Sequence, residues 1–221
     1  MQLPTDEAQL KHIAAQLRKP EGEAGTEVAK MMNIGNSPMN LHTIAVLNPQ
    51  PNQHILEVGM ANGFYTKHVL QMHESLKYTG LDYSAQMVSE AEALNAEYVK
   101  AGRATYVHGN IDAMPFETAS FDQIFTVNTF YFWEDHKATL LELKRVLKPN
   151  SALVLSIRPK QVLEKLSFTK YGFSMIETNQ ILKMLSEAGF HSIELTELKE
   201  PKSSPWDDEM QREVHFIKAL K

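Results

Sequence analysis

The sequence contains no cysteine, and this absence excludes several kinds of chemistry. A chain without thiols cannot form disulfides, use a thiolate as a nucleophile or build a cysteine-based zinc site. The histidines include no pair at the His-x-x-x-His spacing that would place both on one helix face as metal ligands. We therefore expect no metal and no reaction that depends on a thiol.

Long apolar runs and dense positive charge are also missing. No apolar run reaches the roughly eighteen residues of a membrane-spanning helix, and the N-terminus lacks an apolar core followed by a cleavage site. The chain has 22 Lys and Arg against 27 Asp and Glu, a net charge of −5, with no dense basic cluster. This balance argues against nucleic-acid or anionic-membrane binding. We expect a cytoplasmic protein without membrane insertion.

The first part of the chain has the pattern of short helices. Apolar residues follow helical spacing in three stretches, at about residues 6–18, 26–32 and 39–47. Pro20 and neighbouring glycines interrupt the pattern after the first stretch. The segment is too short to build its own core. We therefore predict that residues 1–48 form a helical lid on one domain that spans residues 49–221.

From His54 onward the pattern alternates between strands and helices. The strand-like runs are HILEV, KYTGLD, ATYVH, FDQIFTV and ALVLSI, then HSIELTEL and VHFIKAL. The helical stretches are at about residues 64–73, 84–100, 135–147 and 178–187. Such alternation predicts an α/β fold, a doubly wound and mostly parallel sheet with helices on both faces. Ligands of such sheets bind at the carboxyl ends of the strands, where the strand order reverses.

A glycine loop, ILEVGMANGFYT, follows the first predicted strand. An acid, Glu57, comes two residues before Gly59, and Ala61 and Gly63 follow at alternate positions. A phosphate-binding P-loop would need a Lys-Ser/Thr pair after its glycines, and a dinucleotide loop would need a small residue where Phe64 stands. The spacing instead suits a ligand with a positively charged amino-acid moiety lying against bare backbone.

A second acid, Asp82, ends the next predicted strand. A carboxylate at this position can accept hydrogen bonds from both hydroxyls of a ribose, and the adjacent Tyr83 offers an apolar face to a base. S-adenosylmethionine is such a ligand: a nucleoside whose tail is positively charged and carries no phosphate.

Between His54 and Leu198 the sequence resembles the class I S-adenosylmethionine-dependent methyltransferases of the small-molecule type, similar to the ubiquinone/menaquinone methyltransferase group. The resemblance lies in five ordered segments: ILEVGMANGFYT, YTGLDYSAQMVSEA, VHGNIDAMPFETASFDQIFTVNTFYFWED, LLELKRVLKPNSALVLSI and LSEAGFHSIEL. It implies a Rossmann-like sheet of seven strands, S-adenosylmethionine as cofactor and S-adenosylhomocysteine as product.

The resemblance also implies a set of cofactor-binding residues: Glu57, Gly59, Met60, Ala61, Gly63, Asp82, Tyr83, Met87, Asn110, Ile111 and Asn128. Three positions depart from the family pattern. Ala61 replaces the middle glycine, Asn110 stands where the family usually has Asp, and Asn150-Ser151 replaces Gly-Gly.

The acceptor site is predicted from position in the chain. We expect it to be lined by Asn36, Met39, Tyr131, Trp133, Arg158 and Tyr171. A hydroxyl or ammonium acceptor would also need a base, for which Tyr131, His42 and His136 are candidates. The sequence assigns the catalytic role to none of them.

The predicted function is transfer of a methyl group to a small molecule by direct in-line displacement, in a monomer or homodimer. Two alternatives stay open. One is a methyltransferase-fold protein that binds cofactor and acts as a regulatory or accessory module, and the other is an RNA or protein methyltransferase. The sequence leaves open whether the acceptor atom is oxygen, nitrogen or carbon.

Overall fold

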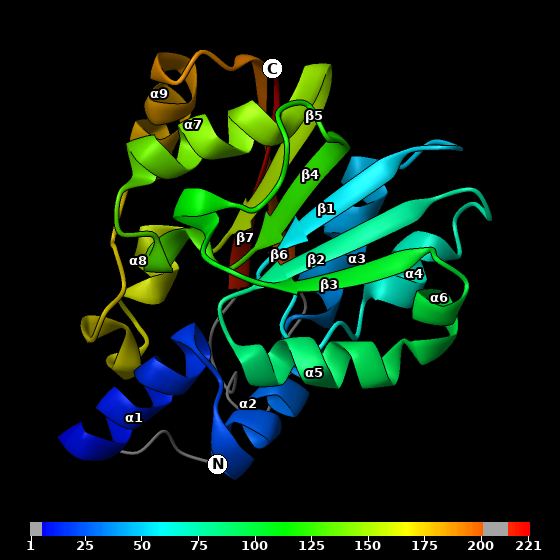
Figure 1. The fold of residues 1–221 in the computed structure, drawn as a ribbon. Coiled ribbons are helices and arrows are strands. Elements are labelled where there is room, and N and C mark those ends of the chain that lie inside the picture. The colour runs from blue at the N-terminus through cyan, green and yellow to red at the C-terminus, as the bar shows by residue number, and fades with distance from the viewer. Residues whose placement is uncertain (1–5, 201–211) are drawn as a thin grey trace.

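The computed structural model describes residues 6–200 and 212–221. Within them, seven strands form one sheet in the order β3-β2-β1-β4-β5-β7-β6 (Figure 1). The strands are β1 (His54–Val58), β2 (Lys77–Asp82), β3 (Ala104–His108), β4 (Phe121–Val127), β5 (Leu147–Ile157), β6 (His191–Glu200) and β7 (Arg212–Leu220). β1 to β5 are parallel, and β7 is antiparallel to both β5 and β6. The doubly wound, seven-stranded sheet is confirmed.

The strand order reverses between β1 and β4. The chain proceeds from β1 outward to β2 and β3, then crosses back to place β4 and β5 on the other side of β1. In this arrangement Val58 pairs with both Leu81 of β2 and Thr126 of β4. The loops that follow these three strands therefore leave the same edge of the sheet, where ligands of this fold class bind.

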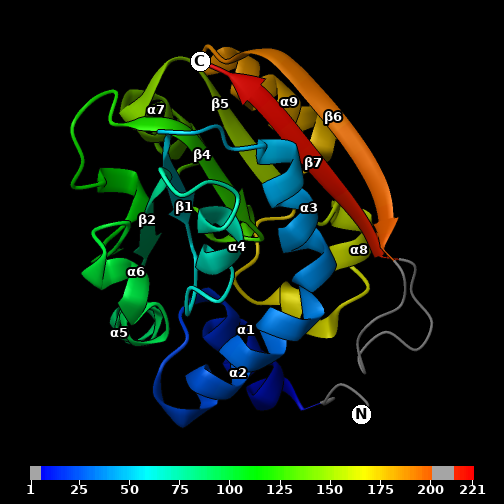
Figure 2. The same ribbon diagram turned by 90° about the vertical axis from the view of Figure 1, so that its right-hand side faces the viewer.

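Helices cover both faces of the sheet. The helices are α1 (Glu7–Arg18), α2 (Gly22–Gly35), α3 (Ser37–Leu47), α4 (Thr66–Leu70), α5 (Ala85–Leu94), α6 (Ala96–Lys100), α7 (His136–Val146), α8 (Lys160–Leu163) and α9 (Thr178–Glu187). Short 3-10 turns are η1 (Ile111–Ala113), η2 (Phe130–Phe132) and η3 (Ser167–Lys170). Figure 2 shows α3 and α4 in front of the sheet, with α7 and α9 behind it.

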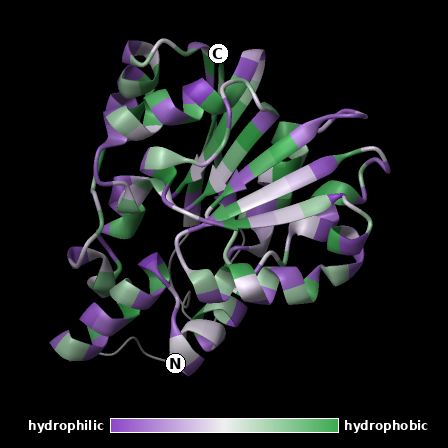
Figure 3. Ribbon diagram, in the orientation of Figure 1, coloured by the Kyte–Doolittle hydropathy of each residue, from purple (hydrophilic) through white to green (hydrophobic). Residues whose placement is uncertain are grey.

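The two faces have separate cores because successive side chains of a strand point in opposite directions. Ile55 and Phe125 pack with the cluster that includes α3, α4 and α5, whereas their neighbours Leu56 and Ile124 pack with α7 and α9. The central strands are thus buried on both sides, and in Figure 3 green, hydrophobic residues are mixed with white and purple ones along them. This burial explains why the run ALVLSI of β5 is almost wholly apolar.

One predicted helix is divided in the structure. The sequence pattern predicts a helix over residues 84–100, but α5 ends at Leu94 and α6 begins at Ala96. The amide of the buried Asn95 between them donates to the carbonyls of Ala91 and Gly63, both at 3.0 Å. A hydrogen bond to the glycine loop, which periodicity does not reveal, therefore accompanies the end of α5.

The N-terminal helices do not all behave as a lid. α3 packs against β4, β5 and β7, and its Thr43 hydroxyl lies 2.7 Å from the hydroxyl of Ser156. Leu47 at its end is buried in the core. α1 and α2 lie across the edge where the strands end (Figure 1). α3 is therefore part of the sheet packing, and a lid role for α1 and α2 stays a prediction.

Gly63 and Gly102 provide a matched test of crowding. Both have a φ of +66°, but a Cβ on Gly63 would lie 2.8 Å from that of Ala91, whereas one on Gly102 would meet nothing within 4 Å. We expect Gly102→Ala to lower the free energy of unfolding by about 1–2 kcal/mol through backbone strain alone. Gly63→Ala should lose about 1–3 kcal/mol more through overpacking, measured by urea denaturation. Equal losses would contradict the assignment of Gly63 to helix packing.

Candidate active site

A cavity of about 250 Å³ opens at the carboxyl ends of β1, β2 and β4. Its floor comes from the loops after these strands, and its roof comes from α1, α2 and the segment that joins them. Its lining residues are Leu17, Arg18, Pro20, Met32, Asn33, Asn36, Asn40, Glu57, Val58, Gly59, Met60, Ala61, Tyr65, Leu81, Asp82, Tyr83, Gly109, Asn110, Ile111, Asp112, Val127, Asn128, Thr129, Phe132, Trp133 and Glu134. We call it the first cavity.

Protein atoms lie close to two glycines of the loop after β1. Gly59 has a φ of +74°, and a Cβ there would lie 2.2 Å from Cγ2 of Thr129, in the loop after β4. Its backbone N–H donates to the carbonyl of Leu81 at 2.8 Å. Gly63 is crowded by Ala91 of α5. Close packing of two strand-end loops and one helix therefore leaves no room for a side chain at Gly59 or Gly63.

Glu57 is the penultimate residue of β1 and carries a buried carboxyl group, with only 4% of its surface exposed. The hydroxyl of Tyr78 donates to its Oε2 at 2.6 Å. Burial raises the pKa of Glu57 from 4.5 to about 7, against the opposite effect of the Tyr78 hydrogen bond. A cation in the cavity would favour the ionised carboxylate and return this pKa toward its ordinary range.

Asp82 holds the glycine loop and the start of α5 together. Its Oδ2 accepts from the backbone N–H of Ala61 at 2.9 Å, and its Oδ1 accepts from that of Ser84 at 2.8 Å. Burial raises its pKa to about 6, although both hydrogen bonds act in the opposite direction. Each carboxylate oxygen can accept a further hydrogen bond, so Asp82 keeps capacity for a pair of ligand hydroxyls.

Ala61 adopts a backbone conformation that usually belongs to glycine. Its φ is 50°, in the left-handed region. This conformation costs an alanine about 1–2 kcal/mol. It points the backbone N–H of Ala61 at Asp82, so the substitution preserves the shape of the loop.

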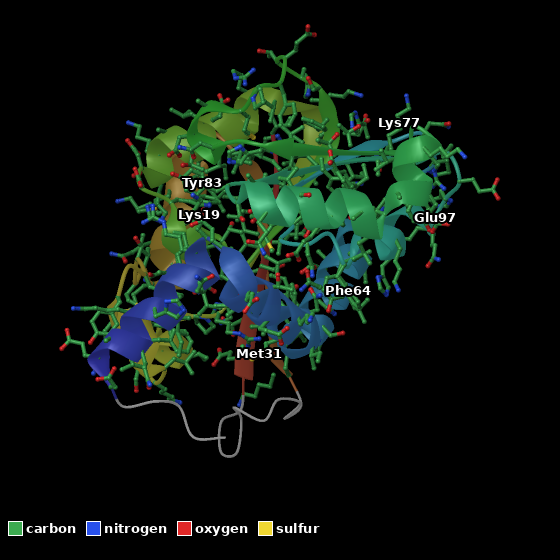
Figure 4. The ribbon with its side chains drawn as sticks, turned by 60° about the horizontal axis from the view of Figure 1, so that its bottom comes forward. Lys19, Met31, Phe64, Lys77, Tyr83 and Glu97 are labelled. Carbon is green, nitrogen blue, oxygen red and sulfur yellow. The ribbon has the colours of Figure 1, made fainter. Side chains whose placement is uncertain are left out.

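The wall of the first cavity formed by the loops after β2 and β3 carries several polar groups. Oδ1 of Asn110 accepts from the backbone N–H of Asp112 at 3.2 Å and starts η1, leaving a second lone pair for a ligand amine. Asp112 accepts from the hydroxyl of Thr139 at 2.5 Å. Tyr83 is 52% exposed, and the ammonium of Lys19 lies 5.3 Å from its ring centroid (Figure 4). Asp112 also lines the cavity.

A second cavity, of about 220 Å³, adjoins the first. The two share Leu17, Met32, Asn36, Asn128 and Phe132. The other residues that line the second cavity are Ile13, Val28, Met31, Gly35, Tyr131, Arg158, Val162, Leu163, Leu166, Phe168 and Phe173. Its walls are therefore mainly apolar and come from α1, α2, η2, α8 and the segment around η3.

The predicted cofactor residues divide into two groups. Nine line the first cavity: Glu57, Gly59, Met60, Ala61, Asp82, Tyr83, Asn110, Ile111 and Asn128. Gly63 and Met87 do not. Gly63 packs against α5, and Met87 is fully buried, with its backbone N–H directed to the hydroxyl of Ser84. These two positions support the cavity wall from behind.

The predicted acceptor residues also divide. Asn36, Tyr131 and Arg158 line the second cavity, and Trp133 lines the first. Met39 does not line either cavity, because it is fully buried against Val214 and Phe216. Tyr171 also lies outside both, with the ammonium of Lys11 5.5 Å from its ring centroid. The packing of α3 on β7 and the fold of the segment after α8 decide these positions, and local sequence shows neither.

Two of the three candidate bases lie away from the cavities. The ring of His42 packs against Phe216 at 4.4 Å between centroids, and Nε2 of His136 lies 3.1 Å from the carbonyl of Phe130. Tyr131 lines the second cavity, but burial strongly raises its pKa, so its phenol stays protonated. The geometry supports none of the three as a base.

The stretch KMMNIGNSPMN forms part of the roof over the first cavity, through Met32, Asn33, Asn36 and Asn40. No motif or apolar pattern in the sequence identifies Arg18 as a cavity residue. It forms an ion pair with Glu134 at 2.7 Å, and both side chains line the cavity.

Within the described ranges, no helix is long and apolar enough to cross a membrane.

Comparison with known proteins agrees with this geometry. Residues 56–155 match the family described as a methyltransferase domain. The chain is 26% identical over 176 residues to the O-methyltransferase resE of Aspergillus sclerotiorum, covering 76% of this chain and 66% of that one. It is 26% identical over 166 residues to the uncharacterized methyltransferase YdaC of Bacillus subtilis, covering 75% and 86%. This chain thus spans just under two thirds of the fungal relative.

Solved structures show the same fold. A chain in the complex between the Haloferax volcanii Trm112 methyltransferase activator and the putative methyltransferase superposes with a TM-score of 0.77 at 18% identity, covering 95% of this chain and 97% of that one. A possible histamine N-methyltransferase from Thermotoga maritima gives 0.69 at 19% identity, covering 95% and 99%. The chain therefore shares the fold of these solved structures, and its residues 56–155 match a methyltransferase domain.

Proposed function

We propose that this protein transfers the methyl group of S-adenosylmethionine to an oxygen atom of a small-molecule acceptor. The observation that carries the proposal is the pair of buried carboxyl groups, Glu57 and Asp82, at the ends of neighbouring strands in the first cavity. A cationic nucleoside fits such a pair. The names of curated relatives, among them several O-methyltransferases, support oxygen as the acceptor atom.

The first cavity would hold the cofactor. Asp82 would accept hydrogen bonds from the ribose hydroxyls through its free lone pairs, and Glu57 would stabilise the ammonium end. Asn110 and Ile111 would meet the adenine, with Tyr83 beside it. Each of these residues already lines the cavity, so the assignment needs no rearrangement of the fold.

The second cavity would hold the acceptor. Its apolar walls and modest volume suit a small molecule better than a protein or RNA chain. Asn36, Asn128 and Phe132 line both cavities and would stand at the junction where the methyl group passes.

The bound cofactor supplies an electrophilic methyl group, and the chain supplies alignment. Residues at the junction would hold the acceptor oxygen in line with the methyl carbon and the sulfur. Alignment of this kind contributes on the order of 7–11 kcal/mol to lowering a barrier. α1 and α2 would exclude water, and the ion pair between Arg18 and Glu134 ties this roof to the loop after η2.

The proposal is tested by titrating the protein with S-adenosylhomocysteine in a calorimeter and comparing Asp82→Asn with Glu92→Gln, which removes a charge from an exposed position of α5. Losing the charged acceptor should weaken binding by about 10–100-fold. Glu92→Gln should bind like the wild type. Thermal unfolding of both variants checks that each is folded. Failure of the wild type to bind, or equal affinity of all three proteins, would contradict the proposed function.

Cofactor binding should depend on pH through Glu57. Its pKa of about 7 in the empty cavity should fall when an ammonium group binds, so binding at pH values just below 7 should release a proton. Affinity for S-adenosylmethionine should then drop as pH falls from about 7, approaching tenfold per unit. Calorimetry in buffers of different ionisation enthalpy measures the released proton.

Glu57→Gln is the control for this pH effect. The variant should bind more weakly at about pH 8 and should lose the pH dependence between about pH 7 and pH 6. Asp82, with its pKa of about 6, would account for any dependence that remains at lower pH. An unchanged profile in the variant would show that Glu57 does not contact the charged end of the cofactor.

A further inference from the structure

Arg158 is a buried cation with an unused donor. It follows β5 directly, only 6% of its surface is exposed, and it lines the second cavity. Its Nη2 donates to Oε2 of the buried Glu200 at 2.9 Å. Among residues 6–200 and 212–221, Nη1 has no hydrogen-bond partner, and neither does Oε1 of Glu200, which does not line the cavity. A buried donor without a partner is costly, so Nη1 is the atom most in need of a ligand.

The position of Arg158 is fixed by its neighbours. The backbone N–H of Arg158 donates to the hydroxyl of Tyr131, which in turn lies within hydrogen-bond distance of Oδ1 of Asn128, at 3.1 Å, and of the carbonyl of Arg158, at 3.2 Å. These contacts tie the residue to the junction of the two cavities, because Asn128 lines both. The backbone of Arg158 is thus held beside the junction, while its guanidinium lines the second cavity next to Glu200.

The rest of the second cavity has no group that can remove a proton. Among the described residues that line it there is no Asp, Glu, His or Lys, and the polar side chains are Asn36, Asn128, Tyr131 and Arg158. Tyr131 stays protonated because burial raises its pKa. The neighbouring acids Glu57, Asp82, Asp112 and Glu134 line the first cavity instead. A neutral hydroxyl bound here would have no base within the walls that hold it.

We propose that the second cavity takes an apolar acceptor that carries an oxyanion delocalised over two oxygen atoms, such as a carboxylate or an enolate conjugated with a carbonyl. Arg158 Nη1 donates to one of these oxygens and the other is methylated. This inference rests on the proposed function and names its substrate class. The acceptor is ionised before it binds, so the absence of a base in the cavity is consistent with catalysis.

The reaction balances without a proton acceptor. A lone pair of the free oxygen forms the new oxygen–carbon bond, while the carbon–sulfur bond breaks and its electron pair stays on sulfur. The negative charge of the acceptor and the positive charge of the sulfonium are both lost, which leaves a neutral ester or enol ether and a thioether. Glu200 compensates the charge of Arg158 when the cavity is empty, because an unpaired buried cation would be destabilising.

The test uses 2-naphthoate and 2-naphthamide, two probes of similar shape of which only the first carries a delocalised oxyanion. Binding to the protein saturated with S-adenosylhomocysteine is measured by calorimetry. We expect the wild type to bind naphthoate at least tenfold more tightly than naphthamide. Binding of neither probe, or equal binding of both, would overturn the inference.

The double variant Arg158→Met/Glu200→Met removes the ion pair without leaving a buried charge. It should lose the preference for naphthoate and keep its affinity for naphthamide. Lys165→Met, which removes an exposed cation beyond α8, should keep the preference. A preference that persists in the double variant would show that Arg158 does not bind the oxyanion.

Glu200→Gln supplies an independent measurement should the double variant not fold. It leaves the charge of Arg158 uncompensated, so affinity for naphthoate should rise severalfold while affinity for naphthamide stays constant. A fall in naphthoate affinity would overturn the inference. Titration of the same preparations with S-adenosylhomocysteine separates the proposed function from the proposed substrate class. Failure of that titration refutes the proposed function. Normal cofactor binding without a naphthoate preference refutes only the substrate class.

Discussion

Burial of two carboxyl groups at the ends of adjacent parallel strands is the constraint on which the site depends. Glu57 and Asp82 are each less than 10% exposed, and burial raises the pKa of both. The hydroxyl of Tyr78 and the backbone N–H groups of Ala61 and Ser84 offset part of this desolvation. The desolvation cost that these hydrogen bonds do not offset favours a ligand that brings positive charge and hydroxyl groups. The fold thus keeps both carboxyl groups buried, and a cationic nucleoside bound beside them would stabilise their ionised forms.

The shape of the glycine loop follows from contacts on its outer side. Gly59 lies against Thr129 and Gly63 lies against α5, so both positions exclude a side chain for reasons of packing. Ala61 accepts the strain of a left-handed conformation and thereby points its N–H at Asp82. The same close contacts that pack the loop also place its backbone along the first cavity.

Two cavities with different walls meet at Asn128. The first is the more polar of the two and lies between the strand ends and the N-terminal helices, whereas the second is mainly apolar and comes largely from α1, α2, α8 and the segment around η3. The loops after the strands build much of the first cavity, and segments outside the central strands build most of the second. Arg158 directly follows the central strand β5 and lines the second cavity.

The sequence by itself determined the alternation of strands and helices, the position of the cavity and the two acids in it, because these depend on local periodicity and on residues at strand ends. Only the tertiary structure decided the rest. It divided the helix at Asn95, brought Arg18 to Glu134, placed Met39 and Tyr171 outside both cavities and paired Arg158 with Glu200. Each of these depends on contacts between segments far apart in the chain, and such contacts leave no periodic signal in local sequence.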